Sequence, residues 1–82
     1  MVKRNVIGQN LKCWRKKRGF SQEQLAAKLH LLGLDLDRSA ISRIESYSRE
    51  VYDYEVVYLS EALNINITYL YLGIIETTTK DV

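Results

Sequence analysis

The residues best suited to binding chemistry lie close together between positions 37 and 46. Arg38 and Arg43 carry forked guanidinium groups, whose geometry suits the acceptor atoms of guanine or the oxygens of a phosphate. Ser39 and Ala40 are small, so the backbone that carries them can approach a partner closely. A short helix that is polar and cationic on its outer side meets the requirements for reading base edges in the major groove of DNA.

The sequence gives little support for catalysis or metal binding. One Cys and one His cannot supply the four N/S ligands of a structural zinc site, and a single Cys excludes an intramolecular disulfide. Asp53 and Glu55 are close in sequence, but no nucleophile, His or Gly-rich phosphate loop accompanies them, and the start of a capped helix explains them better. We therefore expect no enzymatic activity, no metal, no cofactor and no small-molecule ligand.

Charge is distributed unevenly along the chain. Residues 1–20 contain seven Lys and Arg and no acid, whereas residues 21–82 contain five basic and ten acidic residues, so the net charge of +2 is the sum of +7 and −5. A local positive field of this size favours a polyanionic partner. The same charge also fits a solvated basic helix that only aids solubility, and charge by itself leaves both interpretations open.

The length of the chain predicts one small domain. With 82 residues it is well below the length at which chains split into several domains. We expect this domain to cover residues 1–76 and a flexible polar tail to cover residues 77–82. No apolar run reaches the ~18 residues of a membrane span, and no apolar signal core follows the basic N-terminus. We therefore expect a cytoplasmic protein without membrane contact.

Apolar periodicity and capping residues predict five helices, which are the elements that must position these side chains. The first helix covers about residues 5–18, and it places Ile7, Leu11 and Trp14 on one face. Gly19 follows as a C-terminal stop. Because Pro is absent, nothing in the sequence breaks such helices in their interior.

The second and third predicted helices lie on either side of a turn that includes Gly33. Ser21 is expected to cap the second helix and to form a capping box with Gln24. Its buried stripe consists of Leu25, Ala26, Leu29 and Leu32. The third helix begins after the N-cap Asp37 and points its Ile side chains inward. This orientation leaves four polar side chains on its outer face: Arg38, Ser39, Ser42 and Arg43.

The last third of the chain predicts two further helices. A fourth helix covers roughly residues 53–63, after an irregular link over residues 47–51. Asn64 can end it, because Asn tolerates the left-handed conformation. Asn66 then caps a short fifth helix, which Gly73 ends.

Four segments of the chain resemble the phage repressor/Cro-type helix-turn-helix proteins, the xenobiotic-response-element regulator family. Residues 7–15 are similar to the first helix of that family and residues 19–26 to the start of its second helix. Residues 39–45 are similar to its recognition helix and residues 63–70 to its closing helices. Because the motifs follow in the family's order over residues 5–73, the signal is stronger than that of any one motif.

The resemblance implies both a fold and a function. It implies an all-α, five-helix, lambda-repressor-like domain that binds a specific double-stranded DNA sequence as a transcriptional regulator and repressor. The recognition helix, residues 37–46, would enter the major groove, and a homodimer would bind half-sites about 34 Å apart. The C-terminal Tyr-rich helices are a candidate dimer contact, because amphipathic rings suit interfaces.

The resemblance also implies roles for individual residues. Contacts to base edges are expected from Arg38, Ser39, Ser42 and Arg43. Gln22, at the start of the second helix, would contact a backbone phosphate. Residues 1–20 form a basic segment, and further phosphate contacts are expected at one of its ends. They would come from Lys3 and Arg4 or from Lys17 and Arg18. Arg15 and Glu45 correspond to a structural ion pair between the first and third helices.

The sequence departs from the family pattern at two places. The turn before the recognition helix is longer by about five residues, which lie around residues 30–36. Tyr47 stands where the family often has Gly, which adopts positive φ angles without strain. Either the link has a different geometry here or Tyr47 contacts the DNA backbone.

An alternative function is a helix-turn-helix protein-interaction module, an antitoxin or adapter that binds a partner protein. It rests on the Tyr residues of the last third of the chain: Tyr52, Tyr54, Tyr58, Tyr69 and Tyr71. These rings either complete the core or form an aromatic interface, and the sequence leaves both open.

Overall fold

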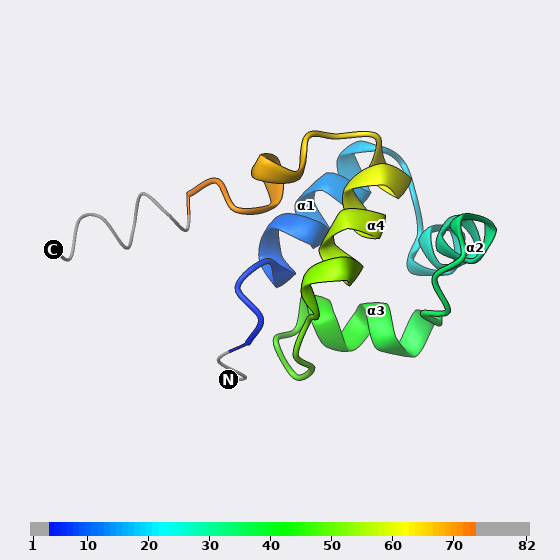
Figure 1. Cartoon of the computed structure of the whole chain (residues 1–82), viewed down its shortest axis with the longest axis horizontal. Helices are drawn as coiled ribbons and strands as arrows, with labels where there is room; N and C mark the ends of the chain where they lie inside the picture. Colours follow the sequence, from blue (N-terminus) through cyan, green and yellow to red (C-terminus); the bar gives the residue numbers. More distant parts are fainter. Residues whose placement is uncertain (1–3, 74–82) are drawn as a thin grey trace, which may run out of the picture.

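A computed structural model describes residues 4–73. Figure 1 shows how its helices are arranged, and their buried side chains form one core. The four α-helices are α1 (Gly8–Lys17), α2 (Gln22–Leu32), α3 (Arg38–Glu45) and α4 (Asp53–Leu63). A short 3-10 helix, η1 (Ile67–Leu70), follows, and no strand occurs within residues 4–73. The predicted all-α class is thus confirmed. The predicted tail at residues 77–82 and Lys3 lie outside the described residues.

The predicted short fifth helix is capped by Asn66, but it is not an α-helix, so residues 4–73 contain four α-helices rather than five. Ile67–Leu70 is a 3-10 helix of four residues. The Asn66 side chain accepts a hydrogen bond from the Thr68 N–H, and the Tyr71 N–H donates to the Thr68 carbonyl, which closes a tight three-residue turn. Two of the four residues are β-branched, and so short a segment forms too few bonds to offset the cost of starting an α-helix.

Local caps set the starts of α2 and α3 as the sequence predicts. Ser21 and Gln24 form a complete capping box, with the Gln24 N–H donating to Ser21 Oγ at 3.0 Å. The Asp37 carboxylate accepts a hydrogen bond from the Ala40 N–H at 2.8 Å. Each cap satisfies backbone donors that the first helical turn leaves open, and this fixes the first residue of the helix.

The start of α1 is set by a contact across the fold. The Asn5 side chain is buried, and it accepts hydrogen bonds from the Ile7 and Gly8 N–H groups. Its amide nitrogen donates to the Ile44 and Arg49 carbonyls, in and just after α3. The helix therefore begins at Gly8 rather than near residue 5, because Asn5 is used to join two chain segments.

The turn between α2 and α3 contributes to the core. Gly33 ends α2 in the left-handed conformation, with φ of 101°. The chain then buries Leu34 and Leu36, while Leu32 is exposed, contrary to the expectation that it extends the buried stripe. The long turn thus anchors the start of α3 by burial of apolar side chains. In Figure 1, α3 lies along the lower edge of the molecule, with α2 beyond its right end.

Candidate nucleic-acid interface

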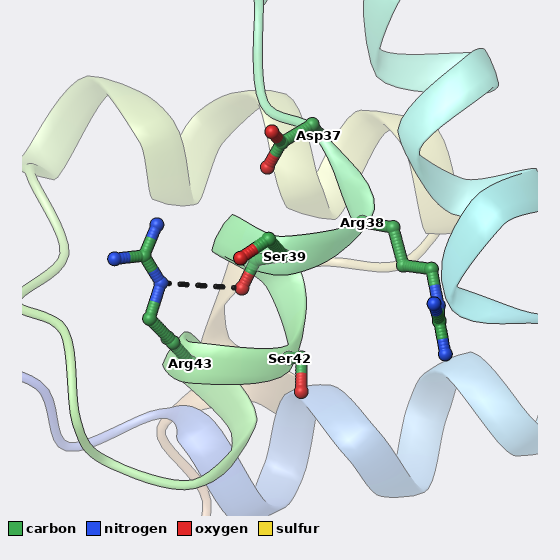
Figure 2. A pocket seen from close by; sticks show the side chains of 5 residues that line it. All are labelled: Asp37, Arg38, Ser39, Ser42 and Arg43. Atoms are coloured by element: carbon green, nitrogen blue, oxygen red, sulfur yellow. Dashed lines mark hydrogen bonds between the residues drawn. The ribbon is translucent and has the colours of Figure 1, made fainter.

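One face of α3 packs on the core and the opposite face is open. Ile41 and Ile44 are fully buried, so they fix the rotation of this helix about its axis. The open face carries the four predicted base contacts, which are all exposed: Arg38, Ser39, Ser42 and Arg43. Together with Asp37 they line a shallow hollow of about 450 Å³. Figure 2 shows the two guanidinium groups pointing to opposite sides of the helix, with the serines between them.

The cationic side chains of this face have almost no partners in the protein. Arg38 has no hydrogen-bond or ion-pair partner among residues 4–73. Arg43 Nε donates to the Ser39 carbonyl of its own helix at a long 3.4 Å (Figure 2). Both guanidinium groups therefore keep N–H donors that an external acceptor can use.

Two further hollows adjoin the one along α3. Arg38 also lines a hollow of about 460 Å³ at the start of α2, with Arg15, Ser21, Gln22 and Glu23. Ser42 also lines a hollow of about 190 Å³ beside α1, with Lys12, Gln22, Glu45 and Ser46. Because neighbouring hollows share residues, the three form one continuous surface, which we call the α3 surface.

A buried ion pair fixes α3 against the first two helices. Arg15 Nε and Nη2 donate to the two carboxylate oxygens of Glu45 at 2.6 and 3.0 Å. The two side chains are only 9% and 4% exposed. Arg15 Nη1 also donates to the Phe20 carbonyl at 2.8 Å, just before α2. The structure thus brings together the two residues that the family resemblance assigns to a structural pair.

Gln22 takes part in the same network. Its side-chain nitrogen donates to Glu45 Oε1 at 3.1 Å. Gln22 also lines both hollows that flank α3, so it lies on the α3 surface even though its amide nitrogen points to Glu45. A phosphate contact by Gln22 remains a prediction.

Tyr47 closes the link that follows α3. Its φ of 62° lies in the left-handed region that Gly would adopt, so at this position the backbone has the conformation that a Gly would favour. The Tyr47 hydroxyl accepts a hydrogen bond from the Gln9 N–H at 2.9 Å and so satisfies a backbone donor in the first turn of α1. A contact between Tyr47 and the DNA backbone remains a prediction, since the hydroxyl hydrogen is still available as a donor.

The predicted phosphate contacts at the end of α1 do not line the α3 surface. The Lys17 ammonium lies 4.8 Å from the centre of the Trp14 ring, and Trp14 packs on Tyr69 of η1. Arg18 Nη2 donates to the Asn64 carbonyl at the end of α4. At the other end of the basic segment, exposed Arg4 lies 3.8 Å from Glu50.

The residues that hold the α3–α4 link were not identified as functional from the sequence. Arg49 donates to both carboxylate oxygens of Glu55 at 3.0 Å, and this hydrogen bonding raises the pKa of the Arg49 guanidinium. Glu55 also accepts a hydrogen bond from the Tyr52 N–H, which completes the capped start of α4. Asn5 also holds this link, because its amide nitrogen donates to the Arg49 carbonyl. An Asn shortly before a helix is a recognisable sign of local capping, but the sign does not reveal bonds to distant residues.

The Tyr residues of the last third divide between core and surface. Tyr58 and Tyr71 are partly buried and pack against the core. Tyr52 and Tyr54 are exposed, and their rings stack 5.9 Å apart. Tyr69 is also exposed. The aromatic residues thus leave rings on the surface, although none of them lines the α3 surface.

Comparison with known proteins identifies the family. The family model described as a helix-turn-helix domain matches residues 8–76, and this family is one of DNA-binding domains. The comparisons with curated proteins and with solved structures found no match. Between residues 4 and 73, no helix is long and apolar enough to cross a membrane. The matched segment includes α1 to α4 and η1, and we conclude that the chain belongs to the helix-turn-helix domain family.

Proposed function

We propose that the protein is a transcriptional regulator that binds a specific double-stranded DNA sequence and acts as a repressor. The observation that carries this proposal is the open face of α3, where Arg38 and Arg43 keep unused N–H donors beside two small serines. In this proposal α3 enters the major groove, and its side chains contact base edges. A bound promoter would then be closed to other proteins.

The start of α2 supports the proposed orientation on DNA. Its first turn lines a hollow that Arg38 also lines, so the positive end of α2 and the guanidinium face the same surface. A helix N-terminus favours an anion such as a phosphate oxygen. In the proposed complex, α2 contacts the DNA backbone while α3 reads the bases. The hydrogen bond from Gln22 to Glu45 links these two helices, and the Arg15–Glu45 pair holds α3 against α1.

We further propose that the protein binds DNA as a homodimer, with two copies on half-sites about 34 Å apart. The exposed Tyr rings of the last third of the chain are the candidate contact between the copies: Tyr52, Tyr54 and Tyr69. The stacked pair of Tyr52 and Tyr54 also supports a second candidate function, an antitoxin or adapter that binds a partner protein.

Selection of bound duplexes from a random DNA pool at near-physiological salt tests the proposal. We expect one palindromic motif to be enriched, because a two-fold dimer presents α3 to two equivalent half-sites. Enrichment of a single half-site would contradict the homodimer and retain specific DNA binding. If no motif is enriched, specific DNA binding is contradicted, and capture of a protein partner through Tyr52 and Tyr54 becomes the experiment to perform.

A further inference from the structure

Lys12 of α1 lies beside the open face of α3. It lines the hollow of about 190 Å³ that Ser42 and Ser46 of the α3 side also line. Lys12 is exposed and has no ion-pair or hydrogen-bond partner in the described part of the chain. The Ser42 hydroxyl in the same hollow is also without a partner there. Two unused donors, an ammonium and a hydroxyl, therefore lie on one hollow.

The acid in this hollow does not neutralise Lys12. Glu45 lines the hollow, but its two carboxylate oxygens already accept hydrogen bonds from Arg15 and from Gln22. The buried Arg15 guanidinium balances the carboxylate charge at 2.6 Å. The positive charge of Lys12 is thus left to act on an external anion at the edge of the α3 surface.

Two cations at the end of α1, Lys17 and Arg18, differ from Lys12 in their surroundings, and exposed Lys16 lines none of the three hollows of the α3 surface. Lys17 lies over the Trp14 ring, and Arg18 is bonded to the Asn64 carbonyl. Neither residue lines one of the three hollows of the α3 surface. A DNA backbone that follows α3 would therefore meet Lys12 before it meets either of these two side chains.

We propose that Lys12 is the cation of α1 that binds a backbone phosphate of the DNA, beside the base that α3 contacts through Ser42. This inference rests on the proposed function, and it moves the phosphate contact of α1 from its end to its middle. In the bound state the Lys12 ammonium donates to an oxygen of the phosphate next to that base, while the Ser42 hydroxyl stays with the base edge. Direct neutralisation of a phosphate releases condensed counterions, so the contact carries a defined salt dependence.

The test is the salt dependence of DNA affinity for three variants of the full chain. The dissociation constant is measured against sodium chloride concentration, on the selected duplex and on a random duplex. Lys12→Ala should reduce the slope of log K against log salt by about 0.9 on both duplexes. Lys12→Arg should retain the slope, and Lys17→Ala, a matched charge deletion on the same helix, should also leave it unchanged.

Two results would overturn the inference: an unchanged slope for Lys12→Ala, or an equal loss of slope for Lys17→Ala. Thermal unfolding of each variant checks that the fold is retained, which we expect because Lys12 is exposed and without a partner. Failure of the proposed function gives a different result. In that case the wild-type protein binds the selected and random duplexes equally well, whatever the slopes of the variants.

Discussion

Replacing Glu45 with Ala should lower the free energy of unfolding by about 3–5 kcal/mol. The substitution leaves the Arg15 guanidinium without its carboxylate partner in a site where only 9% of the side chain is exposed. A buried charge without a partner is costly, because the protein interior does not replace the hydration that the charged group has in water. A domain of this size has a total stability of about 4–12 kcal/mol, so the change is a large part of it.

Urea denaturation followed by circular dichroism measures this effect. Glu61→Ala is the matched control, since Glu61 is an exposed acid away from the first turn of α4, and it should change the stability by less than about 0.5 kcal/mol. The double variant Arg15→Met, Glu45→Met should recover much of the loss, because apolar side chains of similar size can replace a buried ion pair. A loss below about 1 kcal/mol for Glu45→Ala would show that the pair does not hold the helices together.

Gly8→Ala should destabilise the fold by about 1–3 kcal/mol, even though Ala is the better helix former. A Cβ atom at Gly8 would clash with the Ile44 carbonyl oxygen and would lie 3.1 Å from the Tyr47 ring. The first of these contacts is with backbone, so it is relieved only if α1 and α3 move apart. The same movement would tilt α3 and disturb the hydrogen bond from Gln9 to Tyr47.

Two measurements distinguish this packing effect from a general weakening of α1. Gln9→Ala changes the neighbouring exposed side chain and should alter the unfolding free energy by less than about 0.5 kcal/mol. For Gly8→Ala we also expect a smaller preference for the selected duplex, because in the proposed complex a tilted α3 would meet the groove at a different angle. A Gly8→Ala protein as stable and as selective as the wild type would contradict the close approach of the two helices.

Features set by neighbouring residues were predictable from the sequence. The capping box of Ser21 and Gln24, the Asp37 cap of α3 and the bounds of α4 all rest on contacts between residues a few positions apart. Asn64 adopts the predicted left-handed conformation, with φ of 55°. Such local contacts leave a pattern of residue types at fixed spacing, and the pattern indicates the structure directly.

Features set by distant residues were not predictable in the same way. Asn5 bonds to the Ile44 carbonyl, 39 positions away, and no spacing rule reports such a contact. The left-handed φ of Tyr47 is maintained by the link that Asn5 and Arg49 hold in place, which overrides the preference of Tyr for negative φ. Surrounding structure rather than residue type decided these positions.

The roles of the cations in the basic segment, residues 1–20, also depend on contacts with distant residues. Their number and sign were evident, but the choice of contact residue depends on which face of α1 meets α3. Lys12 lines the α3 surface, whereas Lys17 lies over Trp14 and Arg18 bonds to the chain after α4. Because these contacts come from different parts of the chain, the sequence could not distinguish the three residues.

The most direct test of base reading by α3 is the affinity of Arg43→Ala for the selected duplex and for a shuffled duplex of the same composition. We predict that the variant loses about 1–3 kcal/mol of binding free energy on the selected duplex, because Arg43 would donate to a base edge there. Its affinity for the shuffled duplex should change much less. An equal loss on both duplexes would contradict the account, since Arg43 would then contact only the backbone.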